Sequence, residues 1–192
     1  MTPIITYLII GVTCVVSYLA FNDSALRARL LFVPAQVKDR GESYRFLTHG
    51  FIHADFMHLL FNMWALYIFG PYAESAFLAM FGAAFGGAAY LLFYLAAIVA
   101  SSYITYTRHA DNYGYSALGA SGAVAAVMWP FIFIQPWAWF LFPPLPAIIL
   151  GPAYIAYSHY SDKPGTGNLA HQAPLWGSFF RPAAFLACSA SL

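Results

Sequence analysis

The sequence predicts an all-α membrane protein: a bundle of six transmembrane helices with a long structured connection after the first. Of the 192 residues, 61% are hydrophobic and 8% are charged, whereas about a quarter of the residues of a soluble domain are charged. The charged residues also gather in short stretches between uncharged runs, and a run of roughly 20 apolar residues crosses the hydrocarbon layer as a helix. We therefore expect a single multi-pass domain, residues 1–192, in a lipid bilayer.

Charge and cysteine content exclude several classes of function. The formal net charge is +1, without the basic patch that nucleic acid binding requires, so no nucleic acid partner is expected. Cys14 and Cys188 both lie in apolar runs, which indicates neither a disulfide framework nor a metal site. We expect no metal or cofactor, and a location in a bacterial cytoplasmic membrane.

The first helix and the connection after it are separated by the onset of charge. Residues 3–21 carry no charge and predict a first transmembrane helix. Residues 23–55 hold five of the eight basic residues together with several large apolar side chains. We expect this connection to pack against the bundle or to lie in the membrane interface.

A second, short helix is predicted over residues 56–70, and a third over residues 75–101. The Gly-Pro pair at residues 70–71 predicts the turn between them, because both residue types are typical of turns. In the third helix, the spacing of Gly82 and Gly86 allows close packing against another helix.

Residues 112–161 carry no charge and are too many for one membrane-spanning helix. The Gln-Pro pair at residues 135–136 is the expected break, which predicts a fourth helix over residues 115–134 and a fifth over residues 137–157. Four prolines fall in the fifth helix, and each removes a helical hydrogen bond. We expect that helix to be kinked or partly irregular.

A sixth helix is predicted to begin near Asn168. It meets Arg181 after thirteen residues, and an unpaired arginine deep in the bilayer costs about 3 kcal/mol or more. This helix is therefore the one that the sequence supports least.

The run Gly119-Ala120-Ser121-Gly122 is the candidate nucleophile site. A serine between small residues at a helix N-terminus has an accessible hydroxyl, nearby backbone N–H groups and the positive end of the helix dipole. The same run is typical of close helix packing in lipid, where glycine, alanine and serine let backbones approach. Both interpretations stay open on these residues alone.

A serine nucleophile needs a base, and the predicted helices after residue 112 contain no Asp or Glu, which leaves a Ser/His pair. His58 and His171 are the two histidines that lie clearly within predicted helices. His58 and Asn62 are four residues apart on one helix face, where they can stabilise an oxyanion or simply link two helices. His171 is either the base or an interfacial histidine, and we expect Arg45 and Glu74 to satisfy loop backbone.

Four motifs follow one another along the chain. They are Tyr-Arg-Phe-Leu-Thr-His-Gly-Phe-Ile-His at residues 44–53, His-x-x-x-Asn at 58–62, Gly-x-x-x-Glu at 70–74, and Tyr-Ser-Ala-Leu-Gly-Ala-Ser-Gly-Ala at 115–123. In this order and spacing they resemble the rhomboid family of intramembrane serine proteases, over nearly the whole chain.

The resemblance implies a six-helix rhomboid-like bundle that cleaves transmembrane protein substrates near a helix end, without metal or cofactor. It implies that Ser121 is the nucleophile and that His58, Asn62 and backbone N–H groups form the oxyanion hole. The remaining matched positions are implied to be structural: Arg45, Glu74, Gly119 and Gly122.

The sequence departs from the family at the base. The family places a histidine in Ala-His-x-x-Gly on the sixth helix, whereas residues 173–177 read Ala-Pro-Leu-Trp-Gly, so Pro174 occupies the base position. His171 becomes the candidate base, although a regular helix places it about 4.5 Å along the axis and about 60° around from residue 174.

Two functions therefore stay open: a protease with a Ser121/His171 dyad, and a catalytically inactive rhomboid-like protein that binds transmembrane helices. A transporter or channel is disfavoured, because no charged residue lines a predicted pathway. The sequence indicates no oligomeric state.

Overall fold

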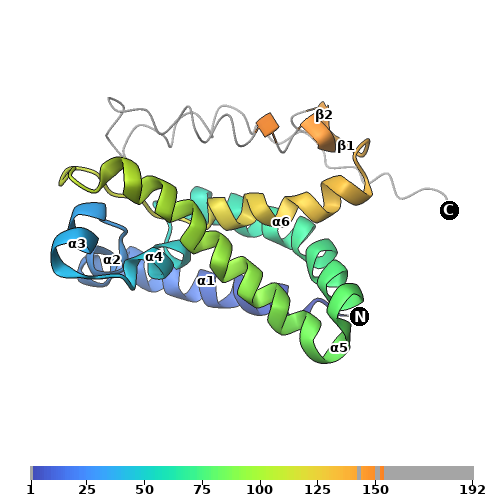
Figure 1. Ribbon diagram of the computed structural model, residues 1–192, viewed down its shortest axis with the longest axis horizontal. Coiled ribbons are helices and arrows are strands. Elements are labelled where there is room, and N and C mark those ends of the chain that lie inside the picture. Colours follow the sequence, from blue (N-terminus) through green and yellow to red (C-terminus); the bar gives the residue numbers. More distant parts are fainter. Residues whose placement is uncertain (1, 142–143, 150–151, 154–192) are drawn as a thin grey trace.

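The computed structural model describes residues 2–141, 144–149 and 152–153, and helices make up most of this part of the chain (Figure 1). The elements in order are α1 (Ile4–Asn22), α2 (Ser24–Leu30), α3 (Pro34–Arg40), α4 (Arg45–Thr48), the 3₁₀ helix η1 (His49–Phe51), α5 (Phe56–His109), α6 (Ser121–Ile134), β1 (Trp139–Leu141) and β2 (Pro144–Pro146). Within the described ranges, α1 and α5 are long and apolar enough to span a membrane. The first of these matches the helix that was predicted over residues 3–21.

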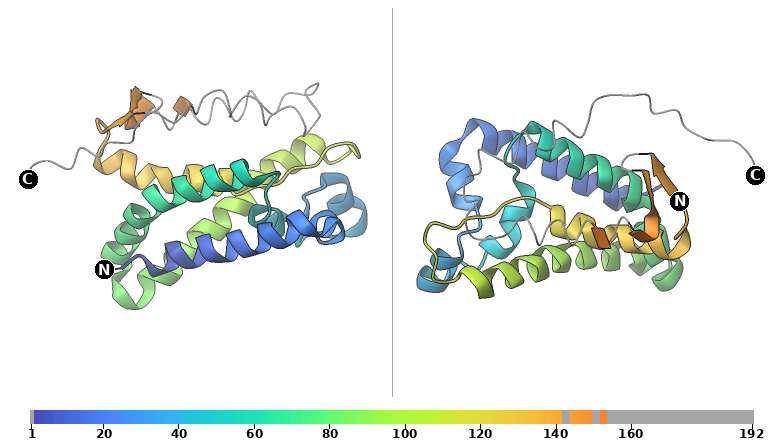
Figure 2. Two further views of the ribbon diagram at one scale, coloured as in Figure 1. Left: turned by 180° about the vertical axis from the view of Figure 1, so that it is seen from behind. Right: turned by 90° about the horizontal axis from the view of Figure 1, so that it is seen from above.

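Helix α5 is two helical arms joined by a sharp reversal. Its 54 residues would extend about 80 Å if straight, more than twice the hydrocarbon thickness. Gly82 has φ 74° and ψ 170°, a left-handed backbone that glycine adopts without steric cost. The chain turns back there (Figures 1 and 2), and the Phe77 and Phe93 rings meet across the turn with centroids 5.2 Å apart. We call residues 56–81 the first arm and residues 83–109 the second arm.

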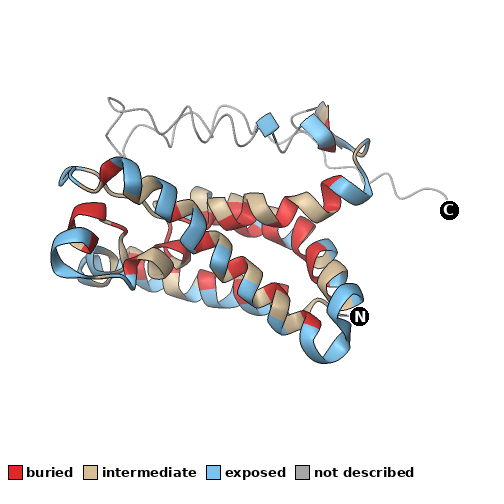
Figure 3. Cartoon of the chain, in the orientation of Figure 1, coloured by how far each residue is buried: buried red, intermediate tan, exposed pale blue. Residues whose placement is uncertain are grey.

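Helix α1 buries its small polar face and exposes its apolar face. Its buried positions are Thr6, Ile9, Thr13, Ser17 and Ala20. Its exposed large side chains include Ile4, Leu8, Val12, Val15 and Leu19, and Figure 3 shows the same inward and outward division along the helices. Small and hydroxyl-bearing interfaces with apolar outer faces are typical of helices packed in lipid.

Helix α6 packs against both arms of α5. Phe131 contacts Phe69 on the first arm, with ring centroids 5.4 Å apart. Gly122 lies against Ser101 on the second arm, where a Cβ on the glycine would be 2.4 Å from the serine Cβ. The core that results is apolar and includes Leu66, Tyr94, Ile98, Ala123 and Val127.

The connection between α1 and α5, residues 23–55, packs against the bundle, which is one of the two placements predicted from the sequence. The Arg45 guanidinium donates to the carbonyls of Ala28 at 2.9 Å and Leu31 at 2.5 Å, and its Nε donates to the Glu42 carboxylate at 2.5 Å. Arg45 is 5% exposed, so its buried guanidinium ties two carbonyls of the connection to one side chain. Apolar side chains of the connection are buried beside it: Phe32, Ala35, Val37 and Ile52.

The turn predicted at residues 70–71 is wrong. The first arm continues through Pro71, at the loss of one helical hydrogen bond. Gly70 serves a contact rather than a turn: a Cβ there would be 2.5 Å from Thr6 Cγ2 and 3.2 Å from the Tyr90 hydroxyl. The reversal falls at Gly82 instead, because the φ and ψ angles of Gly82 are the ones that are not helical.

The predicted fourth helix begins later than expected. Residues 115–120 precede the helix and hydrogen-bond to the connection, and α6 starts at Ser121. The prediction over residues 115–134 is therefore wrong in its first six positions, because apolar content alone does not distinguish a buried extended segment from a helix.

The predicted fifth helix, residues 137–157, is wrong over residues 139–141 and 144–146. There β1 and β2 form an antiparallel pair with Trp139 opposite Pro146 and Leu141 opposite Pro144. Prolines lack the N–H that a helix interior needs but are tolerated at strand edges. The predicted sixth helix, with Asn168 and Arg181, lies outside the described residues.

Candidate active site

The segment that leads into α6 is held by the connection. Phe32 and Ala117 exchange two backbone hydrogen bonds, of 3.0 Å and 2.9 Å, and the carbonyl of His49 accepts from the Gly119 N–H at 2.9 Å. These bonds join parts of the chain that are about 70 residues or more apart in sequence. They fix the point in space at which α6 begins.

Ser121 is the first residue of α6 and is half-buried. The first helical hydrogen bond runs from Val124 N–H to the Ala120 carbonyl at 2.9 Å. The N–H groups of the first turn therefore point towards the N-terminal end, where the positive end of the helix dipole lies. A negative charge that develops on an acyl group at Ser121 would be stabilised there.

His58 lies against the backbone two residues before Ser121. Gly119 has φ 111°, and a Cβ on it would be 2.8 Å from His58 Cε1 and 3.1 Å from His58 Nε2. His58 belongs to the first turn of α5, which the Asp55 carboxylate caps by accepting from the His58 N–H at 2.8 Å. Asn62 is buried one turn further along, and its Nδ2 donates to the His58 carbonyl at 2.9 Å.

His53 was not among the predicted site residues, yet its side chain contacts the same segment. Its Nε2 is 3.4 Å from the Ala120 backbone nitrogen, and its ring meets the His58 ring edge-on with centroids 5.0 Å apart. Burial, and secondarily the neighbouring His58, lower the pKa of His53 to about 3, so the ring is neutral at pH 7. The available signal was its place in the motif at residues 44–53.

His49 is a second histidine of the connection with a structural contact. Its Nδ1–H donates to the Arg45 carbonyl at 2.9 Å, since a carbonyl oxygen only accepts. Burial lowers the pKa of His49 to about 4. Its ring is therefore neutral at pH 7 and holds the turn whose carbonyl binds Gly119.

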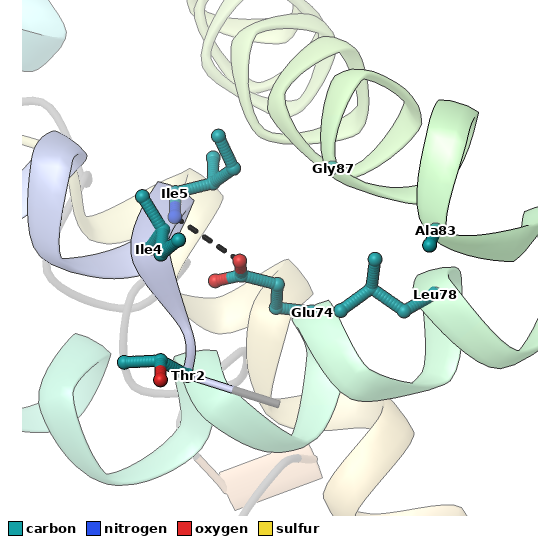
Figure 4. Close-up of a pocket in the computed structure, with 7 residues that line it drawn as sticks. All are labelled: Thr2, Ile4, Ile5, Glu74, Leu78, Ala83 and Gly87. Atoms are coloured by element: carbon teal, nitrogen blue, oxygen red, sulfur yellow. Dashed lines mark hydrogen bonds between the residues drawn. The ribbon is translucent and has the colours of Figure 1, made fainter.

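Glu74 caps the N-terminus of α1 from the first arm of α5. Its carboxylate accepts from the N–H of Ile5 at 3.0 Å, and from the N–H and hydroxyl of Thr6 at 2.8 Å each. The carboxylate lies at the edge of an apolar pocket (Figure 4). The volume of this pocket is about 410 Å³. The residues that line it are Thr2, Ile4, Ile5, Glu74, Leu78, Ala83 and Gly87.

Two of the sequence-derived positions are not described. His171, the candidate base, and Pro174, at the usual base position, both lie outside the described residues. Within the described part of the chain, no three His, Cys, Asp or Glu side chains come together as metal ligands would.

Two apolar helices long enough to cross a membrane, and a serine that begins a helix next to two buried histidines of the connection, indicate a helical membrane protein. A family model described as Rhomboid domain matches residues 40–180. The chain belongs to the rhomboid family.

Two relatives illustrate the similarity. The chain is 33% identical over 150 residues to RHOMBOID-like protein 12, mitochondrial, of Arabidopsis thaliana, a match that covers 72% of this chain and 44% of that protein. It is 31% identical over 134 residues to Rhomboid protease GlpG of Haemophilus influenzae, a match that covers 67% of this chain and 61% of that protein. The chain thus spans less than two thirds of either relative.

Proposed function

We propose that this chain is an intramembrane serine endopeptidase of rhomboid type that cleaves transmembrane protein substrates. The observation that carries the proposal is the packing of the His58 ring against Gly119, two residues before the serine that begins α6. A serine hydroxyl, a ring nitrogen and helix N–H groups in one place are the parts that acyl transfer needs.

In the proposed reaction, Ser121 Oγ attacks the scissile carbonyl and His171 takes the hydroxyl proton. The oxyanion that forms receives hydrogen bonds from His58, Asn62 and N–H groups at the start of α6, which are worth more inside a dry site than in water. His171 then protonates the leaving amine, and a water molecule releases the acyl group by the same path. Arg45, Gly119 and Gly122 support the site through the contacts described above, and Glu74 supports the bundle by capping α1.

A second function is favoured by Pro174. Pro174 occupies the motif position that carries the family's base, and a proline side chain has no titratable group that could accept a proton. The alternative is a catalytically inactive rhomboid-like protein that binds transmembrane helices without cutting them.

A fluorophosphonate probe tests the choice, because it reacts with an activated serine. In detergent, the protease proposal expects labelling that Ser121→Ala and His171→Ala both abolish. Labelling that is absent in the natural chain and appears in Pro174→His would support the inactive alternative. Labelling that persists in Ser121→Ala would overturn the assignment of the nucleophile.

We further propose the membrane arrangement that the family resemblance implies: one domain over residues 1–192, six transmembrane helices, and a bacterial cytoplasmic membrane as its location. The partners are the lipid bilayer and transmembrane substrates. Cysteine substitution in each predicted loop, followed by labelling with a membrane-impermeant thiol reagent, tests the number of crossings.

A further inference from the structure

We propose that His53 is a positioning residue, which links α1 to the segment before Ser121 by a chain of hydrogen bonds that runs in one direction. The chain joins Ser17 on α1, His53 in the connection and Ala120 at the N-cap of α6. The inference about the segment stands on these contacts, and its consequence for Ser121 rests on the proposed function.

The direction of the chain follows from what each group can donate. A backbone nitrogen only donates, so Ala120 N–H donates to His53 Nε2 at 3.4 Å. The proton of the neutral ring is therefore on Nδ1, which donates to Ser17 Oγ at 2.9 Å. Ser17 in turn donates its own proton to the Phe51 carbonyl at 2.9 Å.

All three groups of the chain are withdrawn from solvent. The relative exposure of Ser17, His53 and Ala120 is 0% for each. A buried donor or acceptor that loses its partner is not rescued by water and costs about 1–3 kcal/mol. The other tautomer of His53 would place two N–H groups face to face at Ala120, so Ser17 selects the tautomer that holds the segment.

The hydrogen bonds of this series also show which partner the Ala120 N–H binds. Because the Ala120 N–H donates to His53, it is not an oxyanion donor, and the proposed hole draws on N–H groups that follow it in the sequence. The His53 ring also packs edge-on against the ring of His58, the proposed oxyanion residue, with centroids 5.0 Å apart.

Two substitutions of His53 separate its two nitrogens. Asparagine places an amide near Nδ1 and keeps the contact to Ser17, whereas glutamine places an amide oxygen near Nε2 and keeps the acceptor for Ala120. The exchange rate of the Ala120 amide hydrogen is measured by NMR on the full chain in detergent micelles. We expect this rate to rise about tenfold in His53→Asn. We expect it to stay near the natural rate in His53→Gln.

A second pair of variants on α1 keeps the test valid where His53→Asn does not fold. Ser17→Ala removes the acceptor of Nδ1–H, so we expect the ¹⁵N signals of His53 to shift towards the Nε2–H tautomer and Ala120 exchange to accelerate. The matched control is Thr13→Val: Thr13 is buried one turn earlier on the same face, and its hydroxyl has no hydrogen-bond partner among the described residues. Ala120 exchange that is equal in Ser17→Ala and Thr13→Val, or equal in both His53 variants, would overturn the inference.

Fluorophosphonate labelling of Ser121 separates this inference from the proposed function. If both hold, His53→Gln labels faster than His53→Asn, which a role in general packing does not predict. If the natural chain does not label, the proposed function fails while the exchange rates of Ala120 still decide the inference. Equal labelling of the two His53 variants, with different Ala120 exchange, would overturn the consequence for Ser121.

Discussion

Removal of the Glu74 carboxylate should destabilise the protein far more than removal of an exposed helix cap. Glu74 is 3% exposed and accepts three hydrogen bonds from the first turn of α1. Glu74→Ala removes the acceptor of all three hydrogen bonds, each of which contributes about 1–2 kcal/mol, and leaves the Thr6 hydroxyl only its longer 3.4 Å contact with the Tyr90 hydroxyl. We expect a loss of about 3–6 kcal/mol in the free energy of unfolding, and roughly half as much for Glu74→Gln, which keeps one acceptor oxygen.

The matched control is Asp23, whose carboxylate caps α2 by accepting from Ala25 N–H at 2.9 Å and Leu26 N–H at 3.0 Å. Asp23 is exposed, so water replaces the carboxylate in Asp23→Ala, and we expect a loss of about 1 kcal/mol. Equilibrium unfolding by SDS titration in mixed micelles measures both. If Glu74→Ala and Asp23→Ala lose the same free energy of unfolding, burial does not increase the contribution of a helix cap to stability, which contradicts the prediction.

The buried histidines and two glycines give three further predictions. The pKa values of His49 and His53 are lowered to about 4 and about 3, so below about pH 6.5 the unfolded state binds more protons than the folded state. On acidification towards pH 4, the free energy of unfolding should therefore fall by about 1.4 kcal/mol per pH unit for each histidine. A free energy of unfolding that stays constant between pH 7 and pH 5 would contradict this. Gly119→Ala places a Cβ 2.8 Å from a histidine ring at φ 111°, so thermal unfolding should show a loss of about 1–3 kcal/mol, with reduced labelling of the serine two residues on. Gly122→Ala should cost about 1–3 kcal/mol by overpacking, and Ser101→Gly in the same chain should restore the melting temperature; a double variant no more stable than the single one would exclude that contact as the cause.

The charge pattern predicted the first helix and the packed connection, because charged side chains are excluded from lipid whatever the tertiary structure. It did not predict where α5 reverses. Gly70 and Pro71 have the composition of a turn, but Gly70 is small because Thr6 and Tyr90 approach it, and those contacts come from distant parts of the chain. Gly82 resembles a packing glycine, and only its positive φ shows that it is the turn.

For the candidate site, regular spacing predicted what lies on a helix and missed what lies on a loop. His58 and Asn62 share a helix face, so their relation is visible in the sequence. His53 lies in an irregular segment, and its partners are 36 and 67 residues away. No periodicity records such contacts, and the pairing of Phe32 with Ala117 was invisible for the same reason.

The reversal of α5 at Gly82 has a topographical consequence. The two arms of the hairpin begin and end at the same end of the bundle (Figure 1), and Lys38 and Asp39 of the connection pair with Asp111 and Tyr113 beyond the second arm. The connection that holds the segment before α6 thus lies at the end of the bundle opposite the reversal of α5 (Figure 1). In a bilayer crossed by both arms, the two would face opposite sides.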